Sequence, residues 1–195
     1  TTKPKKIEMA SFLDVYPPGE FGREKAPEQP QYVLITNATI WTQGKQGRIE
    51  NADMLVTRGK ITQVGKAITV PKGAVVIDAT GKHLTPGLID CHSHTAAASI
   101  NEGGQAITCE TRIEDVLNSD DIWIYRQLAG GTTMANVLHG SANPIGGQNS
   151  VVKWRWGSLP EDLLMQGAPP GVKFALGENV KRSNSTLPAG TQARY

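Results

Sequence analysis

The sequence predicts an α/β protein in which a small all-β segment precedes alternating strands and helices. Two observations lead to this expectation. Residues 31–85 hold short β-rich runs separated by turns, and residues 86–182 alternate between strand-like and helix-like patterns. A hydrophobic content of 38% and a charged content of 19% fit a soluble globular protein. The polar, proline-rich residues 1–30 predict an extended arm or linker.

Residues 31–85 read as a small β-sandwich. The runs 32–35, 38–42, 53–57, 60–64 and 74–78 are rich in β-branched and aromatic residues, and turns divide them every eight to twelve positions. Arg58-Gly59 stands between two of these runs and predicts a hairpin, because glycine readily adopts positive φ. No residue in this segment suggests chemistry.

Residues 86–195 read as the beginning of a TIM (β/α)8 barrel. Strands are expected at 88–94, 132–138 and 171–177, with a helix that begins after Ser119 and ends at Gly130-Gly131. A strand, a helix and a second strand of the same sense form a βαβ unit of a parallel barrel. A whole barrel takes about 250 residues, so the expectation is a fragment, or a barrel completed by another chain.

Charge and hydropathy narrow the range of partners. The net charge of +2 is too small to predict a nucleic-acid partner, and no apolar run of eighteen residues predicts a membrane span. The first residues show no signal-peptide pattern, although a cleaved signal remains open. The open edge of an incomplete barrel leaves the rest of the barrel, another chain or a homo-oligomer as its partner.

The strongest chemical signal is a pair of histidines near the end of the strand at 88–94. His92 and His94 are two positions apart, so an extended backbone directs both imidazoles to one side. Two converging imidazoles make half of a transition-metal site. The alternative is an ordinary pair of histidines on a strand, but the preceding Pro86-Gly87 and Asp90 favour the metal.

The stretch Pro86-Gly87-Leu88-Ile89-Asp90-Cys91-His92-Ser93-His94 resembles the first-strand motif of the metal-dependent amidohydrolase superfamily. The similarity extends over residues 31–182. It is greatest to the imidazolonepropionase-related branch, in particular to large secreted bacterial proteins with an N-terminal β-propeller. The resemblance implies one or two divalent transition metal ions, with zinc expected, and a periplasmic or secreted location. It also implies that the catalytic acid/base, an Asp, lies beyond Tyr195.

A third metal ligand is expected at the end of the strand at 171–177. Glu178 is the preferred candidate, with a helix-starting glutamate as its alternative reading. Lys173 is the rival, because a strand lysine becomes carboxylated and bridges two metals in some amidohydrolases. Lys173 precedes Glu178 by five residues, roughly 16 Å of extended chain, and is therefore expected at the wrong end of the barrel.

Substrate-binding residues are expected in the loop that follows the second strand. His139 ends this strand, and Asn143 and Gln148 lie in the glycine- and asparagine-rich residues 140–150. Glycines there would let backbone N–H groups approach a ligand. A plain surface loop is the alternative, but a similar segment occurs in a branch of large bacterial amidohydrolases.

The resulting prediction is a metal-dependent hydrolase of C–N bonds in amides, cyclic amides or peptide-like substrates. A metal-bound hydroxide would attack the carbonyl carbon. The alternative is a non-catalytic scaffold or assembly subunit that keeps the amidohydrolase fold. Retention of both His92 and His94 argues for the enzyme.

Overall fold

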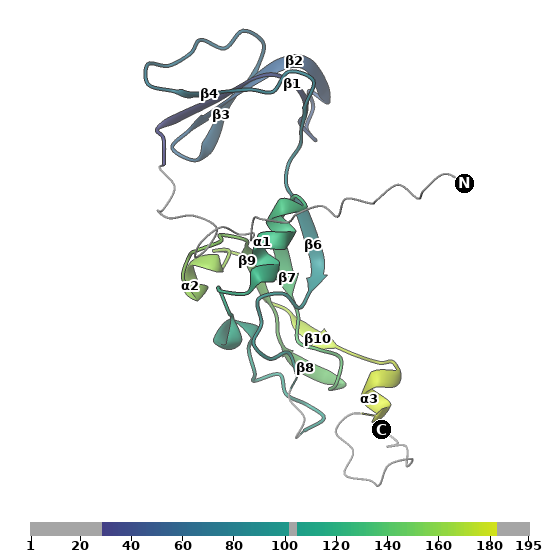
Figure 1. The fold of residues 1–195 in the computed structure, drawn as a ribbon. Coiled ribbons are helices and arrows are strands. Elements are labelled where there is room, and N and C mark those ends of the chain that lie inside the picture. Colours follow the sequence, from purple (N-terminus) through teal and green to yellow (C-terminus); the bar gives the residue numbers. More distant parts are fainter. Residues whose placement is uncertain (1–28, 102–104, 183–195) are drawn as a thin grey trace, which may run out of the picture. The chain divides into compact units, whose positions relative to one another are not determined.

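The structure, a computed structural model, describes residues 29–101 and 105–182 (Figure 1). The predicted arm, residues 1–30, lies almost wholly outside these ranges. The described chain divides into two compact units. The first contains residues 29–89 and 131–134, and the second contains the remaining described residues. Among the described residues, no helix has the length and apolar character needed to cross a membrane.

The first unit is built on a five-stranded sheet. Its members are β1 (Tyr32–Trp41), β2 (Arg48–Thr57), β3 (Lys60–Gly65), β4 (Val75–Asp78) and β5 (His83–Leu84). β1, β2 and β3 form an antiparallel meander, whereas β4 and β5 both pair with β1 in parallel. Arg58 and Gly59 have φ of 48° and 74°, so the predicted hairpin between β2 and β3 is confirmed.

Residues 31–85 form one sheet, whereas the sequence predicted a β-sandwich. The strands of residues 31–85 join one continuous sheet, because the ten-residue β1 pairs with β2 along one edge and with β4 and β5 along the other. A second sheet facing it is not found among residues 29–89. Alanine and isoleucine side chains fill the small core of this unit: Ala38, Ile40, Ala52 and Ala79.

The strand–helix–strand element that the sequence predicts is present, and α1 with the later residues of both strands belongs to the second unit. β6 (Leu88–Ser93), α1 (Ile122–Ala129) and β7 (Thr132–Val137) follow in order, and β6, β7 and β9 (Ser150–Lys153) form one sheet. The Leu88 N–H donates to the Gly131 carbonyl and the Leu138 N–H donates to the Ser93 carbonyl, both at 2.9 Å. Both strands therefore run in the same direction.

The start of α1 is fixed by Asp121 and not by Ser119. The Asp121 carboxylate accepts a hydrogen bond from the Trp123 N–H at 3.0 Å, which satisfies a free donor of the first turn. Its second oxygen accepts from the Ala96 N–H at 2.9 Å. The helix ends at Gly130, as expected.

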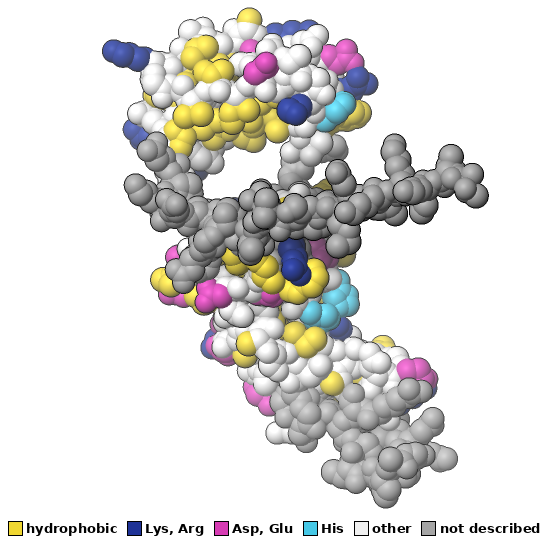
Figure 2. Space-filling model, viewed as in Figure 1, with side chains coloured by type: hydrophobic (Ala, Val, Ile, Leu, Met, Phe, Trp, Pro, Cys, Tyr) yellow, Lys and Arg dark blue, Asp and Glu magenta, His cyan; other side chains and the backbone are white. Residues whose placement is uncertain are grey.

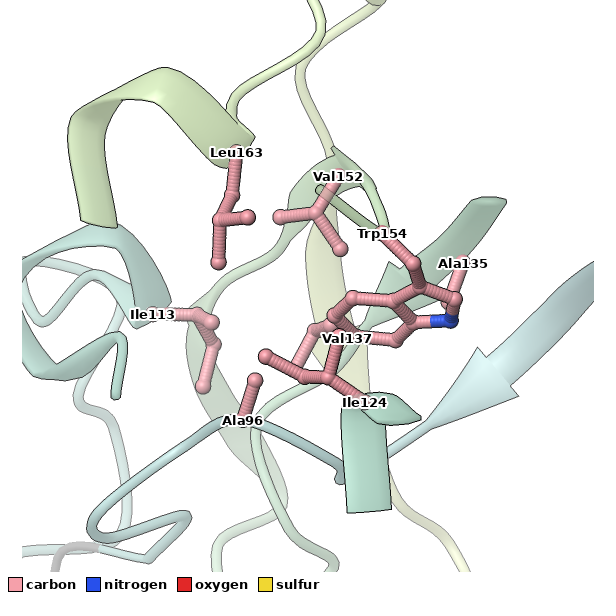
Figure 3. Packing of buried hydrophobic residues seen from close by; sticks show 8 residues of the cluster. All are labelled: Ala96, Ile113, Ile124, Ala135, Val137, Val152, Trp154 and Leu163. Atoms are coloured by element: carbon pink, nitrogen blue, oxygen red, sulfur yellow. The ribbon is translucent and has the colours of Figure 1, made fainter. Parts of the chain in front are cut away.

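A hydrophobic core lies between α1 and β7 and β9 of this sheet (Figure 3). Ile124, Val137, Val152 and Leu163 have no exposed surface, and Trp154 is 4% exposed. Burying one such aliphatic side chain is worth about 1.5–3 kcal/mol. This core holds the segment that follows His94, because Ala96 is part of it.

The remaining elements do not continue a barrel within the described residues. They are η2 (Ile113–Val116), β8 (Ile145–Gln148), α2 (Pro160–Leu163), β10 (Val172–Phe174) and α3 (Glu178–Arg182). β10 pairs antiparallel with β8 in a separate two-stranded sheet. The strand predicted at 171–177 is therefore only three residues long, and it pairs antiparallel where a parallel strand was expected. The mixed α/β class is confirmed, whereas the barrel stays a prediction.

Candidate metal centre

His92 and His94 lie side by side at the end of β6, as their spacing predicts. Their ring centroids are 5.2 Å apart and the rings are nearly perpendicular, at 83°. Both side chains are exposed, and Figure 2 shows histidine side chains at the surface of the viewed face. The His92 N–H donates to the Asp90 carboxylate at 3.1 Å, which fixes the backbone just ahead of the pair.

A backbone carbonyl sets the orientation of His94. Its Nδ1 lies 2.9 Å from the Leu138 carbonyl oxygen. A carbonyl can only accept, so Nδ1 carries the hydrogen and Nε2 of the neutral ring keeps its lone pair. Metal-binding histidines usually have one ring N–H held in this way by a carbonyl or carboxylate.

Lys173 is the third group at this site, and its position corrects the sequence-based expectation. Its Nζ lies 3.4 Å from His92 Nε2 and donates to the His139 carbonyl at 3.2 Å. The expectation that Lys173 lies far from the histidines is wrong. It assumed a strand that runs parallel from 171 to 177, whereas β10 ends at Phe174 and pairs antiparallel with β8.

Both partners of this contact have shifted pKa values. Burial lowers the pKa of Lys173, because the charged ammonium loses solvation. The pKa of the exposed His92 is also lowered, first by partial loss of solvation and then by the neighbouring Lys173 and His94, while Asp90 opposes the shift. The site therefore favours the neutral form of the His92 imidazole and lowers the cost of forming the neutral Lys173 amine. These neutral forms are the ones that can donate a lone pair.

Glu178 is placed differently from the expectation. It is the first residue of the short helix α3, and its carboxylate pairs with Lys181 at 2.8 Å. Within the described ranges, no three His, Cys, Asp or Glu side chains gather closely enough to hold a metal ion. The structure thus does not bring Glu178 together with His92 and His94.

The donor set at His92, His94 and Lys173 fits a divalent transition metal. Two imidazoles are ligands that zinc and similar ions accept, and a catalytic zinc usually takes three protein ligands. The His94 ring already has the tautomer that a metal ligand needs. Lys173 stands where a third donor is required, although an unmodified lysine is a rare ligand.

The three predicted substrate-binding residues do not share one pocket. His139 is 4% exposed and lines a pocket of about 180 Å³ with residues from the 99–116 region. Gln148 lines a different pocket of about 300 Å³, and its Nε2 donates to the Cys109 carbonyl at 2.9 Å. Asn143 is fully buried, and its Nδ2 donates to the Gln105 carbonyl at 2.7 Å.

The glycines of residues 140–150 serve packing. A Cβ on Gly146 would lie 2.6 Å from His139 Nδ1, and a Cβ on Gly147 would lie 2.4 Å from Thr111 Oγ1. Both distances are below any normal contact, so β8 can approach His139 only because these positions lack side chains. The structure does not require these glycines to bring the backbone to a ligand.

A hydrogen-bonded bridge behind the histidines was not foreseen from the sequence. Trp154 Nε1 donates to Gln127 Oε1, and Gln127 Nε2 donates to Thr95 Oγ1, each at 2.7 Å. Thr95 directly follows His94. A glutamine on a helix and a tryptophan 27 residues later give no local pattern, so only the tertiary fold reveals that they meet.

Comparison with known proteins finds relatives that include an amidohydrolase and an imidazolonepropionase. Amidohydrolase tasK of Hapsidospora irregularis is 35% identical over 192 residues, which cover 80% of this chain and 20% of that protein. Imidazolonepropionase of Idiomarina loihiensis is 43% identical over 40% of this chain and 20% of the relative. No family model matches.

The structural comparison agrees. The crystal structure of an amidohydrolase from Thermotoga maritima matches 77% of this chain and 40% of its own, with a TM-score of 0.69 and 38% identity. The chain thus spans about a fifth of the two curated relatives and two fifths of this structure. These similarities support placing the chain in the amidohydrolase superfamily.

Proposed function

We propose that this protein is a metal-dependent hydrolase of amide, cyclic amide or peptide-like C–N bonds. The observation that carries the proposal is the meeting of His92 in β6, His94 just after β6, and Lys173 in β10. The relatives named amidohydrolase, imidazolonepropionase and dihydroorotase support the reaction class. They do not favour the non-catalytic alternative.

In this proposal, His92 and His94 bind a divalent metal, with zinc as the expected ion. A bound ion would polarise the scissile carbonyl and lower the pKa of a bound water. The carbonyl of Leu138 keeps the proton of His94 on Nδ1, so Nε2 is ready to bind. The acid/base Asp and secretion stay predictions from the resemblance, and a homo-oligomer stays a prediction from the open edge of the incomplete barrel.

Lys173 replaces Glu178 as the proposed third ligand. In some amidohydrolases, a strand lysine adds to CO2 and loses a proton, which gives a carbamate whose oxygens bind metal. Only the neutral amine reacts with CO2, and burial of Lys173 favours that form. The His139 carbonyl, at 3.2 Å, holds Nζ near His92.

Metal retention tests this assignment without any substrate. We expect the purified protein to retain zinc, and Lys173→Met to weaken zinc affinity by about 100-fold or more, because loss of a ligand should cost at least as much as the roughly 10–100-fold lost with an outer-shell partner. Glu178→Gln should leave the affinity unchanged. Lys153→Met, which removes an exposed lysine of β9, controls for the loss of one positive charge. Competition with a chelator of known affinity measures all four proteins.

Two outcomes would overturn the proposal. Less than a tenth of an equivalent of transition metal, in protein prepared without chelator, would exclude the metal-dependent function. Loss of metal in Glu178→Gln but not in Lys173→Met would return the third ligand to Glu178. Dependence of zinc affinity on added bicarbonate, abolished by Lys173→Met, would support the carbamate.

A further inference from the structure

Two consecutive backbone carbonyls just after β7 hold two of the three groups of the metal centre. The Leu138 carbonyl oxygen lies 2.9 Å from His94 Nδ1, and the His139 carbonyl accepts from Lys173 Nζ at 3.2 Å. Nζ in turn lies 3.4 Å from His92 Nε2. The direction of these two carbonyls therefore decides where the His94 ring and the Lys173 amine stand.

The peptide group that carries the His139 carbonyl is held by its own surroundings. The N–H of the same peptide belongs to Gly140 and donates to the Ile100 carbonyl. The next carbonyl, that of Gly140, lies 2.9 Å from His139 Nδ1. A carbonyl can only accept, so Nδ1 carries the hydrogen of this pair. The His139 side chain thus closes a turn onto its own backbone and limits rotation of the peptide that faces Lys173.

Glycines of β8 keep the imidazole in the place from which Nδ1 reaches this carbonyl. A Cβ at Gly146 would lie 2.6 Å from Nδ1, and one at Gly147 would lie 2.9 Å from Cδ2. The backbone of β8 therefore packs against the ring and restricts its movement. β8 also pairs with β10, the strand that contains Lys173. The side chain of His139 is thus connected to Lys173 by a second route, through the two paired strands.

Packing alone does not account for a histidine at this position. The side chain is 4% exposed, and its Nε2 has no hydrogen-bond partner within the described part of the chain. A buried nitrogen without a partner costs free energy. Leucine would fill a similar volume without that cost, but it has no N–H group to offer to Gly140. The bond from Nδ1 is therefore the feature that distinguishes histidine from an apolar residue here.

We propose that His139 is a positioning residue of the metal centre. Its Nδ1–H group fixes the turn at Gly140, so that the His139 carbonyl points at Lys173 and holds Nζ beside His92. The inference rests on the proposed function and adds to it a buried residue that acts through Lys173 without touching the metal.

A double-mutant cycle on zinc affinity tests this role in the full chain. His139→Leu keeps a similar side-chain volume and removes the N–H donor. We expect it to weaken zinc binding about tenfold, the lower end of the roughly 10–100-fold lost with an outer-shell partner. In the Lys173→Met background, the same substitution should change zinc affinity by no more than about twofold, because the group that His139 orients is gone. Chelator competition measures all four proteins.

Two amide side chains show whether the position of the donor matters. The amide nitrogen of asparagine is attached to Cγ, as Nδ1 of histidine is, whereas that of glutamine lies one bond further out. His139→Asn should therefore bind zinc more tightly than either His139→Gln or His139→Leu. The visible spectrum of the Co²⁺-substituted proteins gives a second readout, in which His139→Asn should keep the bands of the unchanged protein and His139→Leu should shift them.

Leu163→Val controls for a general loss of stability, because Leu163 is a fully buried residue of α2. It should leave zinc affinity within about twofold of the unchanged protein. Urea unfolding of the metal-free variants shows whether each is folded. If His139→Leu does not fold, the order of His139→Asn and His139→Gln decides alone.

Three results would overturn the inference while zinc retention keeps the proposed function standing. They are an unchanged zinc affinity in His139→Leu, an equal loss of affinity with and without Lys173, and zinc binding by His139→Gln that is as tight as that of His139→Asn. A protein that holds no zinc before any substitution would instead overturn the proposed function, so the two failures are told apart by the unchanged chain.

Discussion

Replacing Gln127 by leucine should destabilise the protein through the bridge that ends next to the histidine pair. Gln127 accepts from the indole of Trp154 and donates to Thr95, both at 2.7 Å. Leucine is of similar size and has nearly the same helix propensity as glutamine. The substitution therefore removes two hydrogen bonds with little effect on α1 itself.

The magnitude follows from the burial of the two partners. Trp154 is 4% exposed, so its N–H would be left in the interior without an acceptor, which costs about 1–3 kcal/mol. Thr95 is half-buried, and its hydroxyl can turn to water, so the second loss is about 0.5 kcal/mol. Together these values predict a loss of about 2 kcal/mol in the free energy of unfolding.

Urea unfolding measures this loss, and a double-mutant cycle isolates its cause. Trp154→Phe removes the indole N–H, so Gln127→Leu should cost about 1 kcal/mol less in that background. Gln63→Leu is the matched control on an exposed glutamine of β3, with an expected change within about 0.5 kcal/mol. The reasoning is refuted if Gln127→Leu costs less than about 0.5 kcal/mol, or costs the same in both backgrounds.

Two further predictions concern packing and charge. Gly146→Ala should cost about 2 kcal/mol or more in thermal or urea unfolding, because its Cβ would meet the buried His139 ring; Gly177→Ala, with open space around it, should be neutral. In metal-free protein, His92 should titrate by NMR below its ordinary pKa of 6.5, and Lys173→Met should raise that midpoint. The unfolded chain then binds more protons, so stability should fall as the pH drops below 6.5; a midpoint above 6.5 would contradict this.

Local patterns predicted local structure well. The spacing of His92 and His94 placed both rings together, and Arg58-Gly59 marked a real hairpin. The strand–helix–strand order also predicted that β6 and β7 lie parallel, because one helical connection joins the end of β6 to the start of β7. Each of these features depends on neighbours in the sequence.

Long-range pairing could not be predicted in the same way. The run at 171–177 has the composition of a strand, but composition does not tell whether its partner is β7 or β8. The observed antiparallel pairing with β8 moves Lys173 to His92 and leaves Glu178 on a helix. A single error in strand partner thus changed the choice of third ligand.

Helix capping and glycine packing show the same difference between what local sequence predicts and what the tertiary fold decides. Asp121 and not Ser119 caps α1, and both were plausible from their residue types alone. The glycines at 146 and 147 signalled a close approach, but the object approached is the His139 ring rather than a ligand. The sequence indicates that space is needed at these positions, and the fold determines what occupies it.

The contact between His92 and Lys173 joins residues 81 positions apart. In an unfolded chain, bringing two such distant side chains together costs substantial loop-closure entropy. A metal ion bound by both would therefore bind the folded chain far more strongly than the unfolded one and stabilise it by mass action. Such an ion would act as a reversible cross-link across the second unit, so zinc supply would control how long the protein survives as well as what it does.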